Sequence, residues 1–191
     1  QAIRRDRFVE CPLAHPTWFI KRSVLVEFGY RDQPWPEDYD LILRLFGAGH
    51  RLSTVPRRLL LWRESPTRLS RRDHRYGIDS FTECRAHFIA SDWLSGGDKY
   101  GLWGYGSTGR SLARALAARG KFPAFIVELH PRRLGQKILG VPVIHPTEIN
   151  AMRHAGTRLI ISVAGQQQRI RAREIAEKIG LCEDVDFICA A

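Results

Sequence analysis

Apolar residues recur at helical spacing in several parts of the first half of the chain. The pattern predicts helices over residues 24–28, 36–46 and 76–94. Short apolar runs predict strands over residues 17–20, 52–55 and 59–62. Gly96 and Gly97 then mark a boundary between two segments of different pattern.

The second half alternates short apolar runs with amphipathic segments. The runs predict strands over residues 100–103, 123–127, 141–144, 158–163 and 186–189. The segments between them predict helices over residues 107–119 and 167–179, and a brief one capped by Thr147. Such alternation favours a parallel sheet with helices on its faces. We therefore expect an α/β protein with two domains, residues 1–97 and 98–191.

Composition agrees with a globular protein of this size. The chain has 191 residues, of which 44% are hydrophobic and 26% charged. No apolar run reaches the roughly 20 residues that span a bilayer, and the N-terminal residues lack the apolar stretch of a signal peptide. The four cysteines show no CxxC spacing, so a zinc site or a disulfide framework is not expected. These features predict a cytoplasmic protein.

The formal net charge of +10 favours an anionic partner. Arginines gather between residues 57 and 75, at positions Arg57, Arg58, Arg63, Arg68, Arg71, Arg72 and Arg75. This segment is either a solvated basic loop or a loop that meets phosphate, whose oxygens match the guanidinium fork. We expect no nucleic-acid partner, because the arginines are not interleaved with aromatic residues and no DNA-binding motif is present.

Three carboxylates stand at the start of the helix expected over residues 36–46: Glu37, Asp38 and Asp40. Acidic residues stabilise a helix N-terminus through the macrodipole, and Asp40 and Arg44 have the spacing of an ion pair within a helix. Taken alone, the motif therefore favours a structural role over a catalytic one.

The surroundings of this motif resemble glycosyltransferase family 2, in the half that receives the acceptor. The matching residues are His15-Pro16-Thr17, Lys21-Arg22-Ser23-Val24-Leu25, Phe28-Gly29-Tyr30-Arg31, Glu37-Asp38-Tyr39-Asp40-Leu41 and Arg44-Leu45, followed by Gly49-His50-Arg51 and the stretch from Pro56 to Arg63. The resemblance covers residues 9–94. It implies the C-terminal half of a GT-A-type domain, followed by a small Rossmann-like domain.

The resemblance also implies a function, which is inverting transfer of a sugar from a nucleotide-diphosphate donor to a glycan or lipid-linked acceptor. Asp38 would be the general base that takes the proton of the acceptor hydroxyl, and Glu37 would orient it. Arg63 and Arg68 would lie near the leaving diphosphate. His15 would face the nucleotide or simply precede a proline in a strand. Bacterial polysaccharide biosynthesis at the inner face of the membrane is the setting that this implies.

A metal belongs to this expectation, but its ligands do not lie in the chain. Asp38-Tyr39-Asp40 matches the text of the D-x-D metal motif, yet its place before a leucine-rich helix fits the base motif instead. The ligands for Mg or Mn, and the nucleotide-binding strands, would lie upstream of Gln1. Whether the chain alone is an enzyme is therefore left open.

A second motif, Gly104-Tyr105-Gly106-Ser107-Thr108-Gly109, follows a predicted strand and opens a predicted helix. In that context G-x-G-x-x-G is typical of a dinucleotide site, where Gly104, Gly106 and Gly109 let a phosphate approach the helix N-terminus. Glu128, about 20 residues further on, stands where an acid would bind a ribose hydroxyl. NAD(P) is the cofactor that this predicts. The glycines are equally explained by packing of the helix on the strand.

The second half also resembles Rossmann-like domains appended to sugar-modifying enzymes, acyltransferases and methyltransferases. The matching residues are Phe125-Ile126, Pro131-Arg132-Arg133, Gly135 and Gly140-Val141-Pro142-Val143-Ile144. Val127 stands where these domains have an Asp, which displaces the ribose acid to Glu128. No Tyr-x-x-x-Lys pair of a sugar dehydrogenase is present. The alternative function is therefore a nucleotide- or dinucleotide-binding regulatory or docking module without catalysis.

Overall fold

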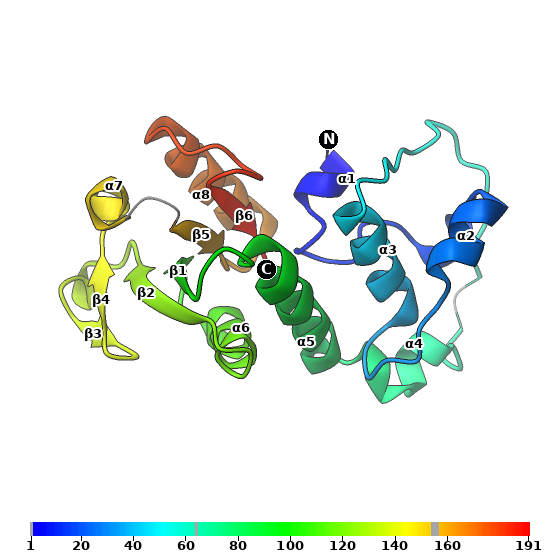
Figure 1. The fold of residues 1–191 in the computed structure, drawn as a ribbon, viewed down its shortest axis with the longest axis horizontal. Coiled ribbons are helices and arrows are strands. Elements are labelled where there is room, and N and C mark those ends of the chain that lie inside the picture. The colour runs from blue at the N-terminus through cyan, green and yellow to red at the C-terminus, as the bar shows by residue number, and fades with distance from the viewer. Residues whose placement is uncertain (1, 64, 154–156) are drawn as a thin grey trace. The chain divides into compact units, whose positions relative to one another are not determined.

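The computed structural model describes residues 2–63, 65–153 and 157–191. The chain divides into two compact units, Gln1–Cys84 and Arg85–Ala191. Figure 1 shows helices in the first unit and a sheet with helices in the second. Because the two units pack internally, each is described by itself.

The first unit is built from short helical elements joined by irregular segments. They are α1 (Ala2–Arg5), the 3-10 turn η1 (His15–Thr17), α2 (Arg22–Phe28), α3 (Glu37–Gly47), α4 (Leu69–Arg72), η2 (His74–Tyr76) and the start of α5 (Ile78–Phe88). The described part of this unit contains no strand, so the strands predicted over residues 17–20, 52–55 and 59–62 are wrong. Leu59 and Leu61 are 72% and 99% exposed, so this apolar run does not pack into a core.

Helix α3 forms the core of the first unit. Its residues 39–46 are all buried, including Asp40 and Arg44. Arg44 donates from Nε to Asp40 Oδ2 at 2.7 Å, which confirms the predicted ion pair. Its terminal nitrogens donate to the carbonyls of Phe28 and Gly29, both at 2.7 Å. The pair therefore joins the end of α2 to α3.

The second unit contains a mixed, mostly parallel six-stranded sheet with the order β3-β4-β2-β1-β5-β6. Its elements are the π-helical turn η3 (Ile89–Trp93), β1 (Lys99–Trp103), α6 (Ser107–Ala117), β2 (Phe122–Val127), η4 (Pro131–Arg133), β3 (Lys137–Ile138), β4 (Val141–Ile144), η5 (Pro146–Glu148), α7 (Ile149–Met152), β5 (Arg158–Ile161), α8 (Gln166–Lys178) and β6 (Phe187–Cys189). Among the strands that the structure describes, the β3–β4 pair is antiparallel and the other pairs are parallel. The α/β class and the Rossmann-like sheet predicted for this half are thus confirmed.

The central strands of this sheet are buried on both faces. Leu102, Ile126 and Ile160 on neighbouring strands have no exposed surface. Helices α6 and α8 lie on opposite sides of the sheet (Figure 1). Covering both faces explains why these strands are nearly continuous apolar runs rather than alternating ones.

Strand β1 is the point where the sheet changes direction. It pairs with β2 on one side and with β5 on the other, in parallel on both sides. The chain therefore builds the sheet outward from β1 first one way and then the other. In sheets of this kind, ligands bind in the crevice at the carboxyl ends of the strands at such a point.

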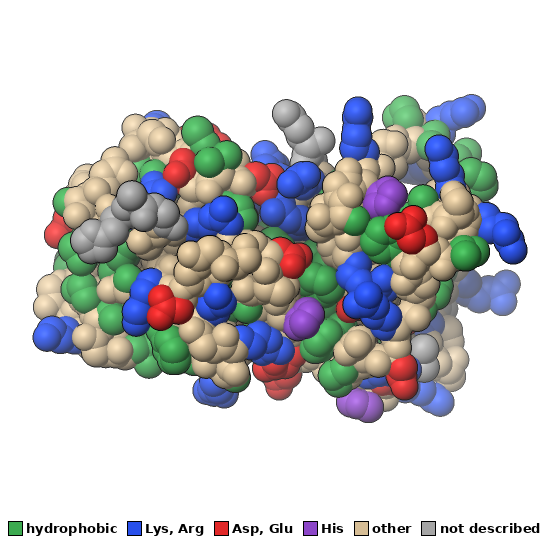
Figure 2. All heavy atoms as spheres, in the orientation of Figure 1, with side chains coloured by type: hydrophobic (Ala, Val, Ile, Leu, Met, Phe, Trp, Pro, Cys, Tyr) green, Lys and Arg blue, Asp and Glu red, His purple; other side chains and the backbone are tan. Residues whose placement is uncertain are grey.

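None of the helices in the part of the chain that the structure describes is long and apolar enough to cross a membrane. On the face drawn in Figure 2, Lys and Arg side chains lie over both units rather than in a single patch. The positive charge is therefore not confined to the segment between residues 57 and 75.

Candidate functional site

The glycine-rich turn joins the carboxyl end of β1 to α6, and its first glycine is required by the backbone. Gly104 has a φ of +91°, which side chains other than glycine rarely adopt. Its amide donates to the carbonyl of Val127 at 3.0 Å. A Cβ at this position would also stand 3.0 Å from the carbonyl oxygen of Ser162. Gly104 thus lets the chain turn tightly at the end of β1, where it contacts Val127 at the end of β2 and Ser162 directly after β5.

The other two glycines of the motif differ from each other. A Cβ on Gly109 would stand 2.1 Å from the carbonyl oxygen of Gly104, so no side chain fits between helix and turn. A Cβ on Gly106 would meet nothing within 4 Å. Packing therefore accounts for Gly104 and Gly109, whereas Gly106 faces open space.

That open space lies at the N-terminus of α6. Gly106 is the N-cap of this helix, no side chain caps it, and its first turn contains no acidic residue. The first amides of a helix have no partner within it, and together with the helix dipole they attract anions. The turn and the helix start are therefore suited to a phosphate group.

Ser162, directly after β5, borders the turn from the other side. It is 3% exposed, and its hydroxyl has no hydrogen-bond partner among the described residues. The hydroxyl would lie 3.7 Å from a Cβ on Gly109. Sequence reasoning missed this residue, although a polar residue directly after a buried strand is a signal that could have identified it.

Glu128 lies directly after β2, beside the turn. Its Oε1 accepts the amide N–H of Tyr105 at 3.2 Å and an N–H of Arg133 at 2.9 Å. The glutamate side chain is 16% exposed. Val127, which stands where similar domains have an Asp, is fully buried. The next residue, Glu128, is therefore the acid beside the turn. Arg133 is a second residue of this site that sequence reasoning did not select.

A separate cluster of polar side chains lies in the first unit. His15 Nδ1 is 3.9 Å from both Glu37 Oε1 and Asp38 Oδ2, and its Nε2 is 2.7 Å from the hydroxyl of Tyr30. The hydroxyl of Tyr76 lies 2.8 Å from both oxygens of Glu37. The structure thus brings together His15, Glu37 and Asp38, and adds two tyrosines.

Burial governs the acid–base properties of this cluster. It raises the pKa of Asp38, and the neighbouring Glu37 raises it further, against the lowering effect of the Tyr39 amide bound at 2.7 Å. Burial and the charge of Asp38 also raise the pKa of the Cys11 thiol to about 12. The carboxyl of Asp38 is therefore easier to protonate than one in water.

The predicted phosphate-binding arginines are not part of this cluster. Arg63 lies in an exposed irregular segment. The guanidinium of Arg68 lies over the ring of Trp62, 3.7 Å from its centre. This cation–π contact gives Arg68 a local packing role.

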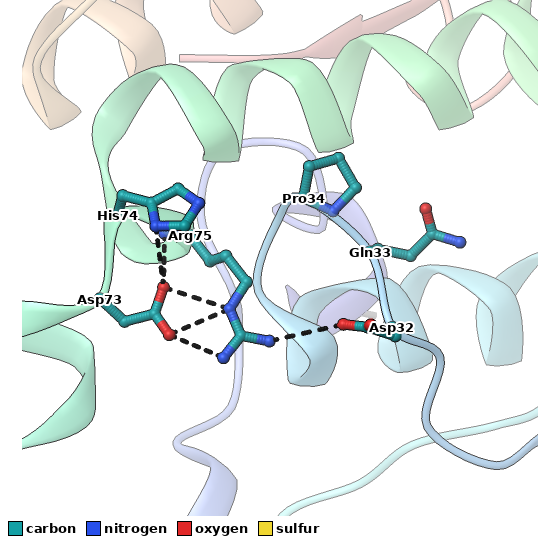
Figure 3. A pocket seen from close by; sticks show the side chains of 6 residues that line it. All are labelled: Asp32, Gln33, Pro34, Asp73, His74 and Arg75. Carbon is teal, nitrogen blue, oxygen red and sulfur yellow. Dashed lines mark hydrogen bonds and ion pairs between the residues drawn. The ribbon is translucent and has the colours of Figure 1, made fainter.

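An open pocket of about 560 Å³ lies on the first unit. It is lined by Asp32, Gln33, Pro34, Asp73, His74 and Arg75 (Figure 3). Arg75 binds both carboxylate oxygens of Asp73, the closest contact being 2.7 Å. Asp73 holds the pKa of Arg75 above its ordinary value and has its own lowered to about 2. The charges of Asp73 and Arg75 therefore compensate each other within this pocket.

Comparisons with known proteins complete these observations. No family model and no curated protein matches the chain. The chain is similar to the crystal structure of RSP, a Rex-family repressor, with 17% identity and a TM-score of 0.38 over 57% of this chain and 59% of that one. The structure of RSP in complex with beta-NADH is similar with 16% identity and a TM-score of 0.39, over 58% of this chain and 61% of that one. The chain thus matches less than two thirds of either structure.

The prediction of a glycosyltransferase of family 2 is wrong. The similar structures are those of a Rex-family repressor. Sugar transfer with Asp38 as general base and a role in polysaccharide biosynthesis are corrected with it, and the Mg or Mn expected for that reaction loses its basis. The contacts explain the acidic motif without transfer chemistry, since Glu37 and Asp38 begin α3 and bind the Tyr76 hydroxyl and the Tyr39 amide.

The expected partners are corrected as well. A nucleotide-sugar donor and a glycan or lipid-linked acceptor at a membrane belonged to the transferase prediction. The exclusion of nucleic acid is corrected too: the structures that the comparison found are, by their descriptions, those of a Rex-family repressor.

Proposed function

We propose that the second unit is a nucleotide- or dinucleotide-binding module of regulatory or docking character, without catalysis of its own. The ligand is NAD(P) or a related nucleotide with a diphosphate. It binds at the carboxyl end of β1, with the diphosphate on the glycine-rich turn.

The observation that carries this proposal is the open space at Gly106. Of the three glycines in the motif, Gly104 and Gly109 lie against protein atoms, but nothing lies within 4 Å of a Cβ on Gly106. This free approach leads to the uncapped N-terminus of α6. A diphosphate placed there would accept hydrogen bonds from the first amides of the helix. These residues therefore fit the phosphates of a dinucleotide.

Glu128 supplies the second contact. It follows β2, the strand next to β1, and is bound to the turn through the amide of Tyr105. A carboxylate there can accept hydrogen bonds from ribose hydroxyls. A bound nicotinamide would supply hydride chemistry, but the chain lacks the Tyr-x-x-x-Lys pair, so the proposed role is recognition.

The test is nucleotide binding by the wild type and by Gly106→Val. Calorimetric titration with NADH, NADPH and ADP should detect binding by the wild type, and Gly106→Val should abolish it because its side chain fills the approach. Gly96→Val is the matched control, since a Cβ at Gly96 also meets nothing within 4 Å. It should bind as the wild type does. At a ligand concentration of 100 times Kd, binding should stabilise the fold by about 2.7 kcal/mol.

Two results would count against the proposal. One is a wild type that binds none of the three nucleotides. The other is a Gly106→Val variant that keeps both its ligand-free melting temperature and the wild-type affinity.

A further inference from the structure

The carboxylate of Glu128 is held in place by two contacts that use the same oxygen. Oε1 accepts both the Tyr105 amide, at 3.2 Å, and the Arg133 guanidinium, at 2.9 Å. The backbone amide of Glu128 donates to the carbonyl of Ile144 at 3.1 Å, which continues the β2–β4 pairing past the strand end. Both the backbone and the side chain of Glu128 are thus fixed beside the turn.

The second carboxylate oxygen, Oε2, has no partner among the described residues. A fixed carboxylate with one oxygen free is a strong acceptor for a hydroxyl, because its orientation is set before the ligand arrives. At the end of β2 that hydroxyl belongs to the ribose next to the bound diphosphate.

Arg133 is already used by the protein. Its NH1 group pairs with Glu128 and lies 3.5 Å from the carbonyl of Tyr105, although 43% of the side chain is exposed. It could bind a ligand phosphate only by giving up or sharing Glu128. A phosphate on the ribose 2′-oxygen would in turn stand against the carboxylate, and like charges at contact repel.

From these contacts we infer that the site is selective for a nucleotide with a free ribose 2′-hydroxyl, so that it takes NAD(H) and rejects NADP(H). Glu128 is the residue that discriminates, and Arg133 is a positioning residue that holds it. This inference rests on the proposed function and names the ligand class of that same site.

Two arginines, Arg132 and Arg133, are neighbours in the chain beside this site. Arg132 is exposed, and its backbone is held by His130 at the amide and by Gln136 at the carbonyl. Without the charge of Glu128, Arg133 loses its ionic partner. Its guanidinium can then bind a phosphate on the ribose 2′-oxygen.

The experiment is calorimetric titration of the full chain and two variants with NADH and NADPH. NADPH would lose the charge-assisted hydrogen bond to Glu128 and would place its 2′-phosphate against that carboxylate. The wild type should therefore bind NADH at least about tenfold tighter than NADPH. Glu128→Gln should weaken NADH binding about tenfold and bring NADPH to equal or higher affinity. Arg133→Gln should weaken NADH binding without improving NADPH. Glu177→Gln, at an exposed position of α8, is the control and should leave both affinities unchanged.

The outcomes separate the two proposals. Equal or tighter binding of NADPH by the wild type overturns this inference while supporting the proposed function. A selective loss of NADPH affinity in Arg133→Gln would show that Arg133 binds the phosphate itself, and also overturns it. Absence of binding by NADH, NADPH and ADP alike overturns the proposed function and this inference with it. Ligand-free melting temperatures equal to that of the wild type establish that each variant is folded.

Discussion

At the residue scale, two of the three acidic residues at the start of α3, Asp38 and Asp40, have contrasting environments. Asp40 is buried and paired with Arg44. Asp38 is largely buried and has no guanidinium partner among the described residues, and the side chains that act on its charge are Glu37 and His15. Because burial penalises the charged form, a carboxylate of this kind opposes folding at neutral pH. The motif therefore contains one carboxylate with a cationic partner and one whose charged form is penalised by burial.

This contrast predicts the effect of Asp38→Asn on stability. The pKa of Asp38 is raised in the folded state, so its contribution to stability is fully present below the unfolded pKa of about 3.9 and is lost as the pH rises through the folded value. Asn removes the charge and can still accept the Tyr39 amide. The variant should melt at a higher temperature than the wild type at pH 7, and the difference should vanish near pH 3. Thermal melting followed by circular dichroism measures both.

Asp98→Asn is a suitable comparison for Asp38→Asn, because Asp98 is exposed. It should show no such difference between the two pH values. A melting temperature of Asp38→Asn below that of the wild type at pH 7 would mean that the charged form is favoured by the fold, contrary to its burial.

At the element scale, α3 contains a buried ion pair whose carboxylate also accepts a hydrogen bond from a tryptophan. Trp35 Nε1 donates to Asp40 Oδ1 at 3.1 Å, and Arg44 binds the other oxygen. Asp40 and Arg44 are 2% and 8% exposed. Such a pair gives little net stability over apolar residues of the same volume, but losing one member leaves an uncompensated charge.

Asp40→Ala should therefore destabilise the first unit by about 3–5 kcal/mol. The double variant Asp40→Leu with Arg44→Met should recover most of that loss, because no buried charge remains. Urea denaturation measures both changes. A loss below about 1 kcal/mol in the single variant would show that Arg44 is satisfied by the carbonyls of Phe28 and Gly29 alone.

The elements of the two units differed in how far the sequence predicted them. In the second unit, buried apolar runs separated by glycines predicted the strands and their parallel pairing. In the first unit, the run at residues 59–62 is also apolar, yet it forms no strand, and the described residues of this unit contain no strand that could pair with it. Pairing is a long-range property that a local pattern does not contain.

The same limit applies to the candidate site. Gly104, Gly106 and Gly109 belong to one local motif, and the sequence could locate them. Ser162 and Arg133 reach the turn from β5 and from the segment after β2, so only the folded sheet brings them there. The resemblance of the first unit to glycosyltransferase family 2 gave a wrong prediction for a related reason. A short acidic motif at a helix start is compatible with capping and with catalysis alike.

At the scale of the whole molecule, the helix before β1 is bound to the sheet of the second unit. Lys121 Nζ donates to the carbonyls of Leu94 and Gly97, both at 2.7 Å. Arg158 lies over the ring of Trp93, 4.4 Å from its centre, and donates to the carbonyl of the same residue. Arg85 donates to the carbonyl of Ala190 at 3.3 Å. Residues before Gly97 thus complete the second unit.

This dependence predicts how fragments of the chain behave. A fragment of residues 78–191, which begins at the first residue of α5, should unfold cooperatively and keep NADH binding. A fragment of residues 98–191, cut at the domain boundary that the sequence predicts, loses the buried side chains of Phe88, Ile89, Trp93 and Leu94. At roughly 1.5–3 kcal/mol for each buried large side chain, the loss equals the whole stability of a typical domain. We therefore expect residues 98–191 alone to lack fixed tertiary structure.

Near-ultraviolet circular dichroism and urea denaturation of the two fragments make the comparison. Two cooperative transitions of equal midpoint would place the domain boundary at Gly97, as the sequence predicts, and would mean that the contacts of Lys121 and Arg158 add little. A cooperative transition for the longer fragment alone would place the boundary within or before α5. In that case the helix is the first element of the proposed nucleotide-binding module, and any fragment used to test NADH binding must include it.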